Sequence, residues 1–411
     1  MLWKIGSFLL VILLTILVYI NVKLYHKPSL HVVDGDTVQY DLLCQLRYLN
    51  AALQSGKAAD MQQLYPEGFV FMQVVTGLAW CDFARSLKPT SPLGIEAHHA
   101  VEQCYRTIAS DEARSTFYKD LPVPYGAFYT GWSNYLLGRK LAMEDPLERS
   151  ENDVTYFKEQ CAAIAEAVSG NKSPFPESYP DAAWPADIVI GIASLKIHDQ
   201  LFAPAYESVI SRWLGKVRNH LDQHGMIPHA VHSLTGKTQE HARGSSQSLM
   251  LIFIHEIDST FGMQQFQLYR KYFLTFRLGI PVMREYPYGT TGHGDVDSGP
   301  VVFQAGAAAS ITGMRTLATY NDQATACALR NATEAFGFAI TRKQEKKYLF
   351  GMLPMADAFI AWSHAGIAPT STPDNSSRNR FHLYSVLAAA VVVTLLFYTL
   401  QSSFFSKTKV E

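Results

Sequence analysis

Apolar segments recur along the chain at a regular interval. Six of them are apolar on nearly every face of a helix and rich in Gly, Ala and Ser, and their starts lie about 55–60 residues apart. A helix that is apolar all round is buried, and small residues let neighbouring helices approach closely. The runs are FVFMQVVTGLAW (69–80), YTGWSNYLLG (129–138), IVIGIASL (188–195), SSQSLMLIFI (245–254), VVFQAGAAAS (301–310) and AFIAWSHA (358–365). They predict a set of buried inner helices.

Amphipathic stretches alternate with these runs and predict outer helices with one solvated face. They are Tyr40–Gln54, Ile95–Ser110, Glu151–Val168, Tyr206–Gln223, Gln264–Phe276 and Asn321–Ile340. Six amphipathic helices alternating with six buried ones predict an all-α fold, an (α/α)6 toroid of helical hairpins. An open solenoid of helix pairs is the alternative, although its usual repeat of about 34–47 residues is shorter. In a toroid, the loops before the inner helices gather at one mouth.

Both ends of the chain carry a segment that could span a bilayer. Ile5–Val22 and Leu383–Leu400 each have roughly 18 residues without a charge, near the minimum for a spanning helix. No small-x-small cleavage site follows the first segment, which therefore predicts an uncleaved anchor. The expected division is an anchor at 1–27, the toroid at 28–368, a tether at 369–382, and a second spanning helix with a tail at 383–411.

Two spans place both termini on one side of a cell membrane and the toroid on the other. Basic residues flank both spans on both sides, so the positive-inside rule gives a tie. The short N-terminal segment resembles a signal anchor, which favours an exported, periplasmic or extracellular toroid.

Composition and motifs narrow the function. The formal net charge is −1 and no basic patch or tail stands out, which gives a nucleic-acid partner no support. The five cysteines are scattered without a C-x-x-C pair, so they indicate buried apolar residues rather than a metal site or a disulfide framework. Gly236-Lys237-Thr238 lacks the earlier glycine and the strand of a P-loop. We expect neither a metal nor a cofactor.

The loop 284–300, which precedes the fifth inner run, holds the densest set of candidate residues. Its sequence is REYPYGTTGHGDVDSGP, and Asp295 and Asp297 lie two residues apart as candidate acid/base carboxylates. Tyr286 could move a proton, and His293 could contact a substrate. As the alternative, Asp297 or Ser298 is an N-cap and Pro300 begins the next helix.

The third loop, 179–187, adds Asp181 and Asp187 as candidate catalytic carboxylates and Trp184 as a flat face for a sugar ring. Pro185 suits a first helical position, which would put Asp187 in the first turn, where a helix favours a carboxylate. Leu353-Pro-Met-Ala-Asp357 repeats this arrangement, so capping alone could explain these aspartates.

The fourth loop, 224–243, is rich in titratable side chains. It supplies His229 as a candidate catalytic residue and Glu240, His241 and Arg243 as candidate substrate-binding residues. A buried Arg243 needs a carboxylate, either from an acidic substrate or from the protein, with Asp295 or Asp297 as candidates. The first two loops add Glu67 and Tyr125 as further binding candidates.

Architecture and the Tyr-Pro or Trp-Pro loops at 65–66, 179–180, 184–185 and 286–287 make the chain resemble the six-hairpin glycosidase-like superfamily. That group contains glycoside hydrolases, polysaccharide lyases and, more distantly, enzymes of the linalool dehydratase-isomerase type. The resemblance implies a membrane-anchored, carbohydrate-active hydrolase with a glycan or small-molecule substrate. The second hypothesis is a lyase or dehydratase that uses Tyr, His and Arg. An open, polar mouth would favour the hydrolase, and a closed, apolar mouth would favour linalool-dehydratase-like chemistry. A non-catalytic glycan-binding or membrane-complex assembly protein is the third.

Overall fold

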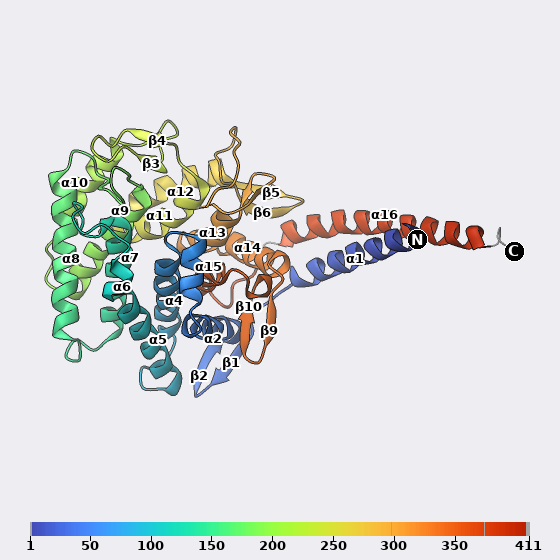
Figure 1. Cartoon of the computed structure of the whole chain (residues 1–411), viewed down its shortest axis with the longest axis horizontal. Coiled ribbons are helices and arrows are strands. Elements are labelled where there is room, and N and C mark those ends of the chain that lie inside the picture. The colour runs from blue at the N-terminus through green and yellow to red at the C-terminus, as the bar shows by residue number, and fades with distance from the viewer. Residues whose placement is uncertain (1, 297, 374, 408–411) are drawn as a thin grey trace.

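A computed structural model describes residues 2–296, 298–373 and 375–407. Within these ranges, six helices form a closed inner ring in which each helix packs on the next and the last packs on the first (Figure 1). In ring order they are α4 (Gly68–Ala84), α7 (Gly126–Met143), α9 (Pro185–Leu201), α11 (Gly244–Ile257), α13 (Ala307–Thr319) and α15 (Pro354–Ala365). The predicted (α/α)6 toroid is therefore confirmed.

The outer helices pack against this ring with their apolar faces. They are α2 (Tyr40–Gln54), α5 (Pro92–Ile108), α8 (Glu151–Gly170), α10 (Glu207–Arg218), α12 (Ser259–Phe273) and α14 (Gln323–Phe336). Side chains of Ser91, Ser150, Asp258 and Asp322 cap the N-termini of α5, α8, α12 and α14, which fixes where these helices start. Short helical segments α3 (Lys57–Leu64), α6 (Asp111–Arg114) and η1 (Leu349–Gly351) lie in the connections.

Short antiparallel hairpins decorate the helical body. They are β1 (Leu30–Val33) with β2 (Asp36–Gln39), β3 (Ala230–Val231) with β4 (Thr238–Glu240), β5 (Leu274–Arg277) with β6 (Ile280–Met283), β7 (Val301–Val302) with β8 (Ala305–Gly306), and β9 (Ile340–Arg342) with β10 (Glu345–Lys347). None joins a larger sheet within the described residues.

Three of these hairpins correct the sequence prediction. The run 301–310 is not helical from its start, because Phe303 and Gln304 adopt left-handed backbone conformations in the turn between β7 and β8. Helix α13 begins only at Ala307, after an N-cap at Gly306, so neither Ser298 as N-cap nor Pro300 as first helical residue was correct. Likewise, the outer helix predicted to reach Phe276 ends at Phe273, and β5 follows. The outer helix predicted to reach Ile340 ends at Phe336, and Ile340 begins β9.

Small residues draw the inner helices together as predicted. A Cβ added to Gly131 of α7 would lie 2.7 Å from the carbonyl oxygen of Asp187 on α9. The two backbones therefore touch beside Asp187, and a larger residue at 131 would push the helices apart. Pro185 and Pro354 occupy the first helical positions of α9 and α15, as their sequences predicted.

Aromatic side chains fill the axis of the ring. The ring of Phe71 lies 5.3 Å from Phe359 and 5.5 Å from Trp132, measured between centroids. Trp132 in turn meets Phe253 at 5.9 Å, and Phe253 stacks on Trp362 at 6.0 Å. Because these residues come from α4, α7, α11 and α15, the plug joins opposite sides of the toroid and closes it to a passage.

An ion-paired layer lies toward the C-terminal ends of the inner helices, at the end opposite the mouth. The carboxylate of Asp82 on α4 is only 7% exposed, and Arg315 of α13 reaches it at 2.7 Å. Arg139 of α7 and Arg85 of α4 approach the same carboxylate, each at 3.3 Å. Arg315 also donates to the carbonyl oxygen of Trp362 on α15 at 2.8 Å. Although burial opposes ionisation, the arginines hold the pKa of Asp82 below its usual value.

Helices α1 (Leu2–Lys23) and α16 (Asn375–Lys407) form an antiparallel pair that projects from the side of the toroid near α14 and β6 (Figure 1). Ser7 and Thr399 hydroxyls meet at 3.1 Å near the distal end, and His382 meets Asn21 at 3.0 Å near the toroid. Both helices are long and apolar enough to cross a membrane. Helix α16 begins inside the segment predicted as a tether.

Replacing Asp82 with Asn should lower the free energy of unfolding by about 1–3 kcal/mol, because it removes the shared counter-charge of the half-buried Arg139 and Arg315. Thermal or urea unfolding of the full chain in detergent measures this loss. Because the folded-state pKa is depressed, the stabilisation should be present above the unfolded-state pKa and disappear as the pH falls through the folded-state value.

The control is Asp60→Asn on the exposed surface of α3, which should change stability by no more than about 0.5 kcal/mol. An equal effect of the two substitutions would contradict the role assigned to Asp82.

Candidate functional site

A cavity of about 270 Å³ opens at the end of the toroid where the inner helices begin. Segments that precede inner helices, or their first turns, contribute to its wall all round the ring, as the toroid prediction required. Its lining is mainly apolar, and the floor is the upper end of the aromatic plug. The apolar floor residues are Phe71, Phe128, Leu249, Ile311 and Phe359.

Carboxylates from two different loops line this cavity. Glu67, just before α4, accepts a hydrogen bond from the hydroxyl of Tyr179 at 2.6 Å. Asp187, in the first turn of α9, accepts one from the hydroxyl of Ser178 at 2.6 Å. Trp184 also lines the cavity, with its ring edge-on to Tyr179 at 6.0 Å. Acidic and aromatic side chains therefore face one cavity.

Neither Asp187 nor Asp357 is the N-cap of its helix, since Trp184 and Leu353 hold those positions. Asp357 is buried and accepts a hydrogen bond from the backbone N–H of Tyr348 at 2.8 Å. Burial raises the pKa of Asp357 to about 8. Asp187 and Asp357 thus both lie in the first turn of a helix that begins with proline, but their surroundings differ. Asp187 lines the cavity, whereas Asp357 binds the backbone of Tyr348, the residue before η1.

His229 lies in the cavity wall in a defined tautomer. Its Nε2 lies 3.4 Å from a guanidinium nitrogen of Arg243, which can only donate, so Nε2 is the acceptor. The proton is then on Nδ1, which faces the hydroxyl of Ser246 at 3.1 Å, and that hydroxyl donates to the carbonyl oxygen of Arg243. Burial, together with Arg243, lowers the pKa of His229 to about 3. The imidazole is therefore neutral near pH 7 and cannot serve there as a proton donor from an imidazolium form.

Arg243 links the fourth and fifth loops behind the cavity wall. It binds Asp295 through two nitrogens at 2.6 and 2.9 Å and donates from Nε to Glu285 at 2.9 Å. Glu285 is fully buried and also accepts from the hydroxyl and the backbone N–H of Ser245. Although burial opposes ionisation, bonds from Arg243 and Ser298 hold the pKa of Asp295 well below its usual range. Asp295 is therefore a structural counter-ion, the protein partner that Arg243 was expected to need.

The remaining predicted residues lie around this core or away from it. Glu240 is exposed, with its carboxylate 3.7 Å from Arg243, and the ring of Tyr286 packs 5.5 Å beneath that guanidinium. The Tyr286 hydroxyl donates to the carbonyl oxygen of His293, itself exposed. Outside the cavity lining lie exposed Asp181, exposed His241 near Asp222, and Tyr125 at the N-cap of α7. Asp297 lies outside the described residues.

Sequence reasoning missed Tyr179, Ser178 and Glu285. Tyr179 opens the third loop in a Tyr-Pro pair like Tyr65, and that repetition was an available signal for a residue at the mouth. Nothing in the local sequence distinguishes Glu285, since its importance comes from burial against Arg243.

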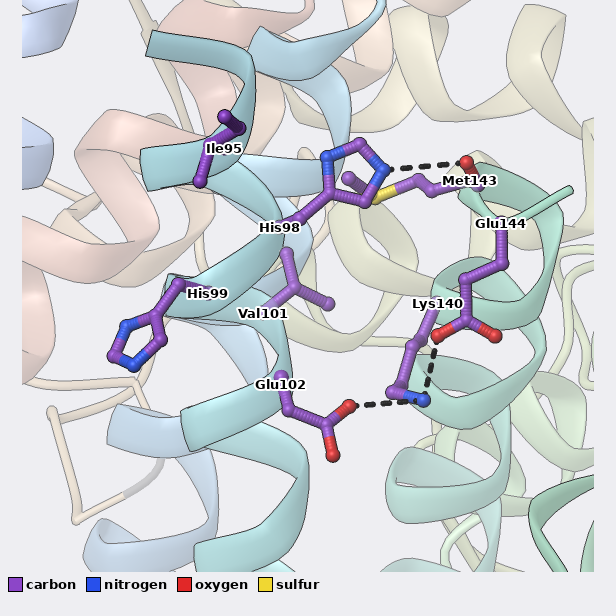
Figure 2. Close-up of a pocket in the computed structure, with 8 residues that line it drawn as sticks. All are labelled: Ile95, His98, His99, Val101, Glu102, Lys140, Met143 and Glu144. Carbon is purple, nitrogen blue, oxygen red and sulfur yellow. Dashed lines mark hydrogen bonds and ion pairs between the residues drawn. The ribbon is translucent and has the colours of Figure 1, made fainter. Parts of the chain in front are cut away.

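A second cavity lies outside the ring between α5 and α7 (Figure 2), with a volume of about 320 Å³. Its central ammonium, Lys140, is ion-paired with Glu102 at 2.9 Å and with Glu144 at 2.6 Å. His98 beside it already contacts the carbonyl oxygen of Met143 at 3.2 Å. Since these groups are paired with one another, the mouth cavity is the candidate site.

Neither a family model nor a curated protein matches the chain. Among solved structures, it is similar to one titled "Crystal structure of unsaturated glucuronyl hydrolase specific for heparin". The match has a TM-score of 0.45 and 11% sequence identity, and it covers 92% of this chain and 96% of that chain. At this similarity we transfer no residue role from it.

Replacing Arg243 with Met should lower the free energy of unfolding by about 3–5 kcal/mol, because Glu285 would keep a buried charge without its partner. Chemical unfolding of the full chain in detergent measures the change. Adding Glu285→Gln to this variant should recover part of the loss, since it removes the stranded charge.

Lys237→Met, in the exposed turn between β3 and β4, is the control and should alter stability by about 0.5 kcal/mol or less. If the double variant were no more stable than Arg243→Met, the ion pair could not be the source of the loss.

Proposed function

We propose that the chain is a membrane-anchored, carbohydrate-active hydrolase whose acid/base pair is Glu67 and Asp187. The observation that carries this proposal is that both carboxylates, from separate loops, line one cavity beside Trp184. Glycoside hydrolysis needs one carboxyl group to protonate the leaving oxygen and a second to activate water or attack the sugar. The membrane anchor is the pair α1 and α16.

Glu67 and Asp187 both lie at helix N-termini, Glu67 as the N-cap residue of α4 and Asp187 in the first turn of α9. Each accepts a hydrogen bond from a hydroxyl at 2.6 Å, Glu67 from Tyr179 and Asp187 from Ser178, and these bonds orient the two carboxyl groups. Either carboxyl group can therefore protonate the leaving oxygen while the other acts as base or nucleophile. His229 is neutral and lies in the cavity wall next to Arg243. It does not donate a proton in this mechanism.

The apolar floor narrows the substrate. A free, fully hydrated oligosaccharide would leave Phe71, Phe128 and Phe359 poorly matched, whereas a sugar attached to a hydrocarbon group would bury both parts. Trp184 and Tyr179 offer ring faces for the sugar. We therefore propose a glycolipid or another glycoside with an apolar aglycone.

The same floor favours a second candidate, a dehydratase or isomerase of an apolar alcohol. Such an enzyme would use the same carboxylates, one protonating the departing hydroxyl and the other removing a proton from the neighbouring carbon. A mainly apolar cavity suits that chemistry as well, so the identity of the substrate distinguishes the two candidates.

Substitutions Asp187→Asn and Glu67→Gln should each reduce turnover by about 10²–10⁴-fold, since each removes one acid/base partner. The assay incubates the full chain in detergent with aryl and alkyl glycosides, with glycolipids and with long-chain allylic alcohols. Released sugar or an altered alcohol is measured by mass spectrometry.

Controls are Asp111→Asn in the first turn of α6 and Glu207→Gln in the first turn of α10, both exposed, which should retain full turnover. Sugar release favours the hydrolase, and alcohol conversion favours the second candidate. Turnover that survived in both cavity variants, or saturable binding without turnover, would overturn the enzymatic proposal.

A further inference from the structure

Exposed apolar side chains gather where α1 and α16 leave the toroid. They lie on three segments that are far apart in sequence: the β5–β6 hairpin, the β7–β8 turn and the end of α14. Phe303 is 83% exposed and Leu278 is 64% exposed, which is unusual for large apolar residues of a folded body. We name Phe276, Leu278, Val302, Phe303 and Phe336 together the hairpin-base patch.

Direct contacts fix this patch at the start of α16. A Cβ on Gly279, in the β5–β6 turn, would lie 2.5 Å from Cβ of Arg380 and 3.0 Å from the backbone nitrogen of Phe381. Arg277 then ties the second turn to the first, since its Nε donates to the carbonyl oxygen of Phe303 at 2.8 Å. Figure 1 shows β5 and β6 reaching along the first turns of α16.

The third segment reaches the same level. The ring of Phe336, at the end of α14, meets Phe381 edge-on at 6.2 Å. Phe381 stands where the charged start of α16 gives way to its long apolar run. The whole patch therefore surrounds the point at which the helix pair would enter a bilayer.

The neighbouring polar groups suit a membrane interface. Arg378 lies over the ring of Tyr25 at 3.9 Å, and Lys23 lies over the ring of Tyr19 at 5.8 Å. Arg380 is exposed beside the β5–β6 turn. Aromatic rings beside cations are typical of the headgroup level, with apolar side chains reaching toward the acyl chains.

We propose that the hairpin-base patch inserts into the interfacial layer of the bilayer and forms a second membrane contact beside the helix pair. This inference rests on the membrane anchoring proposed above. The partner is the lipid surface itself, because the patch lies beside the start of α16, where the apolar helix pair leaves the toroid. The toroid would then lie with one side against the membrane.

The patch also connects the membrane to the candidate site. The segment 296–308 carries Val302 and Phe303 at its turn, while Val296, Pro300 and Ala307 of the same segment line the cavity. A single loop is thus both part of the lipid contact and part of the cavity wall.

The test uses site-specific labelling of the full chain reconstituted in lipid vesicles. All five native cysteines are buried, so a thiol-reactive environment-sensitive dye should attach to an introduced cysteine. The patch variants are Phe303→Cys, Leu278→Cys and Val302→Cys, each at an exposed position that should tolerate the change. Lipids carrying a nitroxide near the top of the acyl chain serve as the quencher.

Two further labelled variants make the outcomes distinguishable. Val391→Cys, exposed in the middle of α16, reports whether the helix pair is in the bilayer, and Leu234→Cys, in the β3–β4 turn, reports the aqueous surface. We expect blue-shifted emission and strong quenching at 303, 278 and 302, and at most weak quenching at 234. Circular dichroism and thermal unfolding verify that each variant is folded.

Quenching at 391 together with dye at the patch behaving as it does at 234 would overturn the second contact and leave the anchoring intact. Without quenching at 391, the anchoring itself fails, and the inference fails with it. Sugar release or alcohol conversion in the assay above is independent of both results.

Discussion

Closure of the inner ring is the constraint on which the rest of the structure depends. Helices that must pack on both neighbours and on an outer layer have little surface left for water, so they are apolar all round. Their side chains converge on one axis, where Trp132, Phe253 and Trp362 fill the space. The charged side chains in this region pair with one another, since Arg315 and Arg139 both bind Asp82. These ion pairs connect α4, α7 and α13 at the end opposite the mouth.

The same constraint explains the character of the mouth cavity. Because the ring supplies the floor, the floor is apolar, and polar chemistry can enter only from the loops. Glu67 and Asp187 come from loops on different hairpins, so their meeting in one cavity is a consequence of the circular arrangement. Above the plug, the rings of Trp184 and Tyr179 extend the aromatic lining to the rim of the cavity. A substrate that is part sugar and part hydrocarbon matches this gradient.

Much of the fold could be predicted because the ring imposes a period on the sequence. The starts of the apolar runs lie at nearly equal intervals, and the outer stretch Tyr40–Gln54 is α2 residue for residue. The method failed at 301–304, where an apolar segment belongs to a hairpin. An apolar composition indicates contact with either protein or lipid and does not distinguish between them. In addition, the residue types of Phe303 and Gln304 do not predict their left-handed backbone conformations.

The site was harder to predict for a related reason. Asp295 and Asp187 look equally suited to catalysis as loop aspartates, and their roles separate only through partners distant in sequence. Arg243, 52 residues from Asp295, neutralises it, whereas Asp187 keeps a hydroxyl partner and faces the cavity. Glu67 ranked only as a binding residue because its partner Tyr179 lies 112 residues away.

The fifth loop takes part in the ion pair with Arg243, in the cavity wall and in the surface beside the helix pair. Arg243 holds it to the fourth loop through Asp295. Its residues Val296, Ser298, Gly299 and Pro300 line the cavity, and Phe303 lies at the base of the helix pair. A displacement of the β7–β8 turn by lipid would therefore act on the wall next to Asp187 and Glu67, and Arg243 opposes such a displacement with a bidentate bond to Asp295. The bidentate bond from Arg243 thus restrains the same loop that carries Phe303, which is the arrangement needed if the cavity is to keep its shape while its rim contacts a fluid bilayer.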